Sequence, residues 1–156
     1  MKDPVTVWRL CARRRVDAAF TGNGAYRRGG RWNLPGTRVV YCAESRALAA
    51  MEILVHVEDM EDLARIEWRA IAVAVPGEAI ERPDRYPNSW RAYPYCPVTQ
   101  KFGSTWARAG RTVALRVPSA VVPGEFNYLL NPEHEMFAKL KIASAEQFAF
   151  DSRIGR

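Results

Sequence analysis

The sequence lacks the long hydrophobic runs and the paired cysteines that mark several large classes of protein. No apolar stretch in its 156 residues approaches the roughly 18 residues that a membrane-spanning helix needs. The first ten residues include an acid and a proline with no long apolar stretch behind them, so we expect no secretory signal and a cytoplasmic protein. The three cysteines, Cys11, Cys42 and Cys96, are odd in number and widely spaced, which argues against a disulfide framework.

Histidine is also scarce, and its scarcity limits the chemistry that the chain can perform. His56 and His134 are the only two histidines, and neither is paired at a zinc-binding spacing, so we expect no metal site. No G-x-S-x-G surrounds Ser119, so a Ser-His-Asp triad has no local motif to support it. The chain also lacks the Gly-Lys-Ser/Thr of a P-loop and any helix-turn-helix, zinc-finger or RNA-binding signature.

Positive charge is what the sequence has in excess. The formal net charge is +6 and the isoelectric point is near 9.5. Such a balance favours an anionic partner: nucleic acid, a phosphorylated small molecule or an acidic protein. Residues 13–15 form one group of arginines, and Arg27, Arg28 and Arg31 form another among glycines. Charge alone leaves the partner open, and a small basic nucleic-acid-binding protein without catalysis is the alternative to an enzyme.

The residue pattern predicts a single α+β domain over residues 1–156, rich in strands and with two helices. Ser45 is placed to cap a first helix that runs to about Val57, and Gly110 to end a second helix over residues 99–109. We expect a glycine-rich loop over residues 21–37, an acidic turn over 58–62 and a proline-rich surface excursion over 76–98. The expected strands are residues 5–10, 38–42, 66–75, 112–117, 127–130, 139–143 and 147–151.

Glu52 is the most telling residue of the first expected helix. Helical spacing places it on one face with Leu48 and Val55, beside a core face that includes Met51. Its carboxylate is therefore expected near the core, a position that costs free energy unless the carboxylate is paired or has a function. His56 follows one helical turn later, so a Glu52–His56 pair at the helix edge is the structural alternative.

Three further features carry groups suited to chemistry. Residues 22–33, GNGAYRRGGRWN, combine glycines that let the backbone approach a ligand with arginines that suit phosphate, although a mobile basic loop has the same composition. Tyr41 lies just before the first helix, and its ring can either stack on a planar ligand or fill the core. Ser119 lies between two prolines directly after a strand.

The order of these motifs resembles the RES-domain family, which is named for an arginine, a glutamate and a serine. The resemblance rests on GGRWN, VVYCAES, ALAAMEILVH, TQKFGSTW, LRVPSAVVP and NYLLNP, and it extends from Trp8-Arg9 to about Arg153. It implies an ADP-ribosyltransferase-like fold with mixed or antiparallel strands around a central cleft. It also implies a toxin of a bacterial type II toxin–antitoxin system whose partner antitoxin carries a helix-turn-helix DNA-binding region, with no membrane and no direct nucleic acid as partner.

The same resemblance implies an activity and a set of site residues. Members of the family destroy NAD or transfer ADP-ribose, so we expect NAD+ as the substrate and water, phosphate or a protein side chain as the acceptor. Carried over to this sequence, the family's arginine, glutamate, serine, tyrosine and N-terminal arginine are Arg31, Glu52, Ser119, Tyr41 and Arg9. Asn127 lies in a family motif, and we expect it to contact NAD+ together with His56, which is placed to orient Glu52.

A mechanism follows from the chemistry of NAD+. Its nicotinamide is already cationic, so no general acid is needed to expel it, and the transition state resembles an oxocarbenium ion. We expect the Glu52 carboxylate to stabilise that charge and to hold a ribose hydroxyl. Arg31 and Arg9 are expected to bind the pyrophosphate. Tyr41 is expected to stack on the nicotinamide ring, and Ser119 to position the substrate through a hydrogen bond rather than to attack it.

Overall fold

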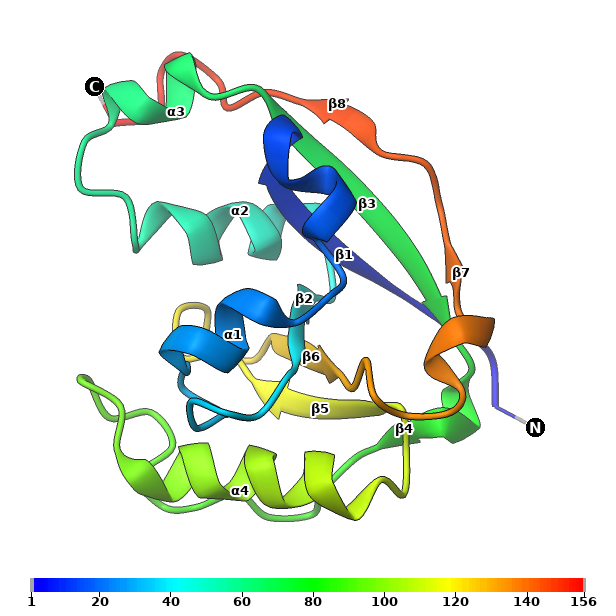
Figure 1. The fold of residues 1–156 in the computed structure, drawn as a ribbon. Coiled ribbons are helices and arrows are strands. Elements are labelled where there is room, and N and C mark those ends of the chain that lie inside the picture. The colour runs from blue at the N-terminus through cyan, green and yellow to red at the C-terminus, as the bar shows by residue number, and fades with distance from the viewer. Residues whose placement is uncertain (1, 156) are drawn as a thin grey trace.

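The protein is built around one curved sheet, seen edge-on in Figure 1. The computed structural model describes residues 2–155, so the expected domain over 1–156 extends one residue beyond them at each end. The strands are β1 (Val5–Ala12), β2 (Val40–Ala43), β3 (Trp68–Val75), β4 (Ile80–Glu81), β5 (Ala114–Pro118), β6 (Phe126–Leu130), β7 (Lys141–Ile142) and β8 (Glu146–Phe148). Their order in the sheet is β4-β5-β6-β2-β1-β3-β7, and β8 also pairs with β3.

The helices lie to one side of this sheet and beneath it, as Figure 1 shows. They are α1 (Asn23–Arg28), α2 (Arg46–Leu54), α3 (Glu61–Arg65) and α4 (Pro97–Ala109), with short 3-10 turns at Arg13–Ala18, Gly77–Ala79 and Phe137–Lys139. Neighbouring strands are antiparallel except for β4 and β5. The predicted α+β class is therefore confirmed. No helix within residues 2–155 has the length and hydrophobicity that crossing a bilayer requires.

The sheet opens between its two halves. β1 pairs with β3 along eight residues, and β2 pairs with β6 along four, but β1 and β2 meet at a single pair, Trp8 and Ala43. Beyond that pair the two strands diverge. Backbone groups in such an opening need partners other than a neighbouring strand, and the candidate site lies there.

Alternating residues of the strands fill two main hydrophobic clusters. Val73 and Val75 of β3 are fully buried in the first cluster, and their spacing follows the two-residue period of a pleated strand. Trp32, Trp106 and four other buried apolar residues form the second cluster, which joins the glycine-rich segment to α4 and β5. The second cluster therefore fixes the segment that carries Arg31 to the body of the protein.

Local capping signals place both predicted helices. The Ser45 hydroxyl accepts a hydrogen bond from the Leu48 backbone N–H at 3.0 Å and caps α2, as predicted. Gly110 ends α4 in the left-handed conformation, with φ of 64°. α4 begins two residues before the predicted start, because Pro97 is compatible with the first turn of a helix.

The predicted core face of α2 is wrong in its second half. Leu48 is buried, but Met51 and Val55 are exposed. α2 packs its first turn against Ala43 and Leu10, whereas its last turn extends over the opening between β1 and β2. Helical period alone does not indicate where the supporting sheet ends.

Two predicted irregular segments contain short helices. α1 lies inside the expected loop over residues 21–37, and α3 begins within the expected acidic turn over 58–62. α1 has six residues, too few for a hydrophobic period to identify. Tertiary contacts support it instead: the Asn33 side chain donates to the Ala25 carbonyl at 2.9 Å, and the Arg38 guanidinium lies 4.2 Å from the centre of the Tyr26 ring.

Candidate functional site

A pocket of about 370 Å³ lies where β1 and β2 diverge. Its volume falls in the usual range for small-molecule sites, about 300–1,000 Å³. Five of the residues predicted for NAD+ border it together: Arg9, Tyr41, Glu52, His56 and Asn127. The remaining lining residues are Trp8, Leu10, Cys42, Ala43, Ala49, Ile53 and Val57. The opening in the sheet thus brings together predicted residues that are up to 118 positions apart, from Arg9 to Asn127.

Glu52 and Ser119 form the polar contact at the edge of this pocket. The Ser119 hydroxyl donates to Glu52 Oε1 at 3.3 Å, and Ser119 itself is buried. The serine oxygen also accepts hydrogen bonds from the backbone N–H groups of Val121 at 3.1 Å and Val122 at 3.0 Å. Both acceptor positions of the hydroxyl are therefore used, and its single proton is left for Glu52. This arrangement fixes the carboxylate and leaves the serine oxygen unsuited to attack.

Arg9 spans the gap that the missing strand pairs leave. Its Nη1 donates to the Tyr41 carbonyl at 2.9 Å, so a side chain replaces a backbone donor there. Among residues 2–155, its buried Nε has no hydrogen-bond partner. A buried donor without a partner costs about 1–3 kcal/mol of stability. The neighbouring Cys42 is no nucleophile, because burial raises the pKa of its thiol to about 12.

Tyr41 supports the glycine-rich segment through its hydroxyl. The hydroxyl donates to Asn33 Oδ1 at 2.6 Å and accepts from the Trp32 backbone N–H at 3.1 Å. Burial raises the pKa of this hydroxyl above its usual range, so the group stays protonated and remains a donor. Gly30 lies against the same oxygen, and a Cβ there would approach it to 2.7 Å. The sequence predicted either a ligand-stacking role or a core role for the Tyr41 ring, and it did not indicate this role of the hydroxyl.

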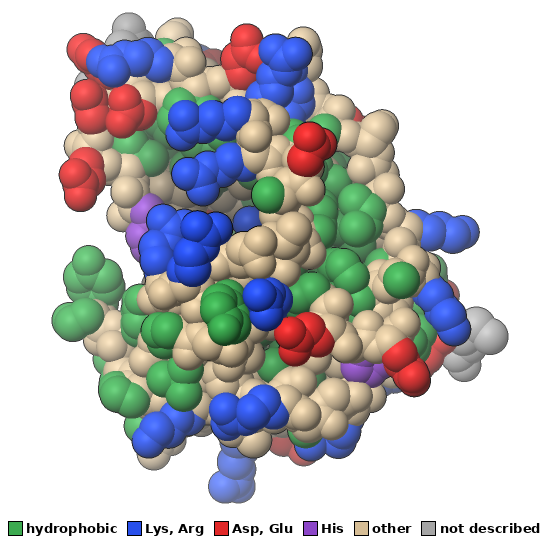
Figure 2. Space-filling view, viewed as in Figure 1, with side chains coloured by type: hydrophobic (Ala, Val, Ile, Leu, Met, Phe, Trp, Pro, Cys, Tyr) green, Lys and Arg blue, Asp and Glu red, His purple; other side chains and the backbone are tan. Residues whose placement is uncertain are grey.

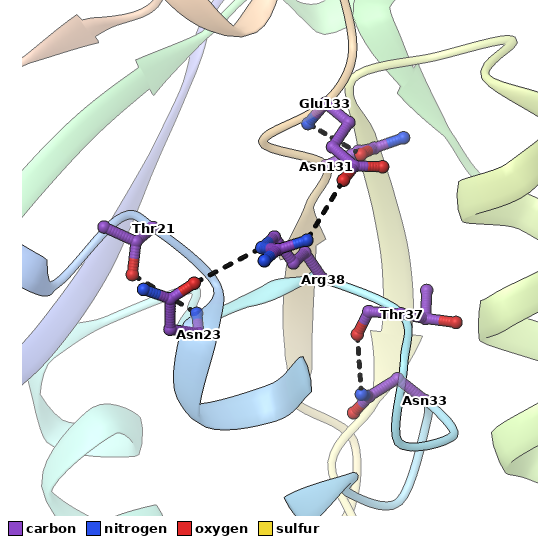
Figure 3. A network of polar contacts seen from close by, with 7 residues as sticks. All are labelled: Thr21, Asn23, Asn33, Thr37, Arg38, Asn131 and Glu133. Atoms are coloured by element: carbon purple, nitrogen blue, oxygen red, sulfur yellow. Dashed lines mark hydrogen bonds and ion pairs between the residues drawn. The ribbon is translucent and has the colours of Figure 1, made fainter. Parts of the chain in front are cut away.

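Asn33 is the buried centre of the segment, and sequence reasoning missed it. Its side-chain amide donates to the carbonyls of Ala25, Leu34 and Thr37, the last of which is drawn in Figure 3. Figure 3 also shows Arg38 on the same segment, bonded to Asn23 and Glu133. Residues 29–37 are thus a fixed structure rather than a mobile basic loop. The signal in the sequence was the asparagine in GGRWN, which side-chain-to-backbone bonding favours in turns.

Arg31 does not border the pocket, and its contacts lie with a distant part of the chain. Its Nη1 donates to the carbonyls of Trp90 at 2.8 Å and Ala92 at 2.7 Å, and its guanidinium lies 5.7 Å from the centre of the Tyr95 ring. These bonds use one nitrogen of the guanidinium. The other nitrogens keep donor capacity for an anion. The part of the chain around Trp90, which binds Arg31, gave no functional signal in the sequence.

His56 borders the pocket without contacting Glu52. It is exposed, and within residues 2–155 no hydrogen bond or ion pair joins the two side chains. α2 ends at Leu54, before a full helical turn connects Glu52 to His56. The predicted pair therefore does not form, and Ser119 holds the carboxylate instead.

Removal of the Tyr41 hydroxyl is expected to loosen the segment that carries Arg31. In Tyr41→Phe, Asn33 Oδ1 and the Trp32 N–H lose their partner inside the protein, which costs about 1–3 kcal/mol of the free energy of unfolding. Urea denaturation measures this loss. Tyr93→Phe is the matched control, because Tyr93 is exposed and its change is expected to stay within about 0.5 kcal/mol. Equal stability of Tyr41→Phe and the unchanged protein would contradict the role of the hydroxyl.

The fold and pocket define a small α+β protein whose candidate site lies in the opening of a curved sheet, with a carboxylate on one side and arginines nearby. A family model described as the RES domain matches residues 6–151. The chain therefore belongs to the RES domain family, as the sequence motifs indicated.

Similar proteins cover nearly the whole chain. "Toxin Res" of Yersinia enterocolitica is 36% identical over 149 residues, which are 95% of this chain and 98% of that protein. "Prs ADP-ribosylating toxin" of a Sphingobium species is 36% identical over an alignment of 156 positions, which covers 96% of each chain. A chain from the crystal structure of the Mycobacterium tuberculosis MbcT–MbcA toxin–antitoxin complex matches with a TM-score of 0.72 and 19% identity, over 94% of this chain and 85% of that one. The similarity to that crystal structure shows that the two chains share a fold.

Proposed function

We propose that this chain is the toxin of a bacterial toxin–antitoxin pair and that it cleaves NAD+ at the bond between nicotinamide and ribose. The relatives named as toxins and the relative named as ADP-ribosylating support this proposal. The observation that carries the chemistry is the Glu52 carboxylate, oriented by the buried Ser119 hydroxyl at a pocket of ligand size. The expected partner is an antitoxin with a helix-turn-helix region, and the expected location is the cytoplasm.

In the proposed reaction the C–N bond from ribose C1′ to nicotinamide breaks. Its electron pair leaves with the ring, which becomes neutral nicotinamide. Positive charge grows on the ribose, and the Glu52 carboxylate stabilises it more strongly in the transition state than in the bound substrate. A lone pair of the acceptor then forms the new bond to C1′, and the acceptor loses its proton to solvent. Ser119 keeps Glu52 in one orientation, so the charge needs no reorganisation during the step.

The dinucleotide is held by the groups around the carboxylate. Arg9 borders the pocket, and its guanidinium binds an anionic oxygen of the dinucleotide there. Arg31 lies beyond Tyr41 and offers its remaining guanidinium nitrogens to the pyrophosphate. Tyr41 lines the pocket, and in this proposal its ring packs against the nicotinamide. Asn127 lines the pocket and supplies an amide for a ribose hydroxyl or for the ring amide.

Replacement of Arg31 is expected to weaken binding of NAD+. Hydrogen bonds from a charged donor contribute about 1.5–3 kcal/mol, so Arg31→Ala is expected to raise KM for NAD+ by about tenfold or more. Steady-state kinetics of nicotinamide release measures KM and kcat separately. Arg108→Ala removes an exposed arginine from the end of α4 and controls for the change in net charge. Unchanged KM in Arg31→Ala would remove Arg31 from the binding site.

Proton NMR of NAD+ mixed with the purified protein tests the proposed function. Release of free nicotinamide is the expected result, and a parallel sample with added phosphate separates hydrolysis from phosphorolysis through the ribose signals. A third sample with radiolabelled NAD+ and cell lysate detects transfer to protein. NAD+ that stays intact in all three samples would overturn the proposal.

A further inference from the structure

The Pro87–Cys96 segment is a fixed structure beside the candidate site. Two of its turns are closed by backbone hydrogen bonds, from Trp90 to Pro87 at 3.0 Å and from Ala92 to Ser89 at 2.9 Å. The Trp90 ring packs on the second hydrophobic cluster, and Arg31 binds the carbonyls of Trp90 and Ala92. The backbone that carries the side chains of this segment is therefore held in place before any partner arrives.

This fixed segment exposes aromatic surface. Tyr93 has 89% of its surface exposed and Tyr95 has 40%, and Arg91 is exposed next to them. We call these three residues the aromatic rim. Figure 2 shows hydrophobic side chains projecting at the left edge of the molecule, where Figure 1 places the tip of the segment before α4. Tyrosine and arginine are the residues that protein interfaces favour, because each combines a large contact area with a polar group.

The stretches of chain that carry the aromatic rim and the Arg31 segment are rich in arginine, and the acids Glu81 and Asp84 lie just before the first of them. Residues 85–118 and residues 18–43 contain no Asp or Glu. Arg27, Arg28 and Arg91 are exposed, and within residues 2–155 none of them forms an ion pair. Figure 2 shows Lys and Arg side chains gathered above the projecting hydrophobic group on the same face. A partner that covers this surface therefore brings acidic side chains.

Arg31 and Tyr41 connect the aromatic rim to the pocket. Tyr95 lies over Arg31, and both are near enough to the Tyr41 hydroxyl to influence its pKa, in opposite directions. Tyr41 borders the pocket that Glu52 also borders. A protein bound to the aromatic rim therefore lies next to the side of the pocket that Tyr41 borders.

We infer that the aromatic rim is the docking surface for a protein that accepts ADP-ribose, and that this protein presents an acidic surface patch to Arg91, Tyr93 and Tyr95. The inference rests on the proposed function. In the transfer, the C1′–nicotinamide bond breaks and nicotinamide leaves with the electron pair. A nucleophilic side-chain atom of the docked protein forms the new bond to C1′ and loses its proton to solvent. Docking raises the local concentration of that atom at the pocket, whereas water needs no docking.

The experiment compares two reactions of the same variants. Tyr93→Ser and Arg91→Glu are each incubated with radiolabelled NAD+ and cell lysate, and separately with NAD+ alone. Loss of an interface anchor costs about 1.4 kcal/mol or more, so we expect labelling of a discrete protein band to fall about tenfold or more in both variants. Nicotinamide release without lysate is expected to stay within about twofold of the unchanged protein. Ile142→Ser, which alters an exposed apolar residue on the distant β7, is expected to leave both reactions unchanged.

Salt supplies a second readout. Because opposite charges on the two proteins attract over about 8–10 Å at physiological ionic strength, labelling of the band is expected to fall as salt rises, while nicotinamide release changes little.

Equal labelling by Tyr93→Ser and the unchanged protein overturns the inference. So does nicotinamide release with no labelled band, which assigns the acceptor to water or phosphate. Unchanged labelling with weaker neutralisation by the antitoxin assigns the surface to that partner. A complete lack of nicotinamide release refutes the proposed function instead.

Discussion

Glu52→Gln is expected to lower the rate of nicotinamide release from NAD+ by about 10²–10³. The amide has nearly the shape of the carboxylate, and its oxygen can still accept the hydrogen bond from Ser119. What the substitution removes is the negative charge beside the ribose. The loss is therefore expected in kcat more than in KM, because the charge matters most where positive charge develops.

The same substitution is expected to leave the fold intact. Glu52 is half-buried and forms one side-chain hydrogen bond, so the thermal midpoint of Glu52→Gln is expected to stay near that of the unchanged protein. Glu78→Gln, at an exposed position remote from the pocket, is the matched control for loss of one carboxylate. Retention of more than about a tenth of the activity by Glu52→Gln would contradict charge stabilisation, given the usual size of such effects.

Gly103→Ala is expected to have the largest effect on stability. A Cβ on Gly103 would lie 1.8 Å from the Trp32 carbonyl oxygen, far inside van der Waals contact. Neither backbone has room to move. Trp106 is buried one turn later on α4, and the Ser104 hydroxyl accepts from the Leu34 N–H at 2.9 Å. Overpacking against backbone is expected to lower the free energy of unfolding by about 3 kcal/mol or more.

Thermal and urea denaturation measure this loss. Gly24→Ala is the matched control, because Gly24 lies in α1 and a Cβ there meets one flexible arginine nitrogen at 3.4 Å. Its stability is expected to change by at most about 1 kcal/mol, in the stabilising direction, because alanine favours the helix. The close packing of α4 on the Arg31 segment would be refuted if Gly103→Ala unfolded at the same urea concentration as Gly24→Ala.

Most strands and the two larger helices were predictable because their signals are local, whereas the two-residue β4 lies inside the segment expected to be a surface excursion over 76–98. The Ser45 cap bonds a backbone group three residues away, and Gly110 supplies a conformation that other residues avoid. Hydrophobic alternation in β3 likewise reflects only the pleat of one strand. α1 and α3 were missed because five or six residues are too few for a period to emerge, and tertiary contacts such as Asn33 to Ala25 stabilise them.

The sequence by itself determined the family through its motifs, the α+β class, the helix that carries Glu52 and the basic character of the surface. Only the tertiary structure decided what each side chain contacts. Ser119 reaches Glu52 across 67 residues, and Arg31 reaches Trp90 across 59. The helix that was expected to bring His56 to Glu52 ends too early to do so. The physical reason is that capping and periodicity act within one or two turns of the chain, whereas partners for buried polar groups come from whichever segments the packed core brings together.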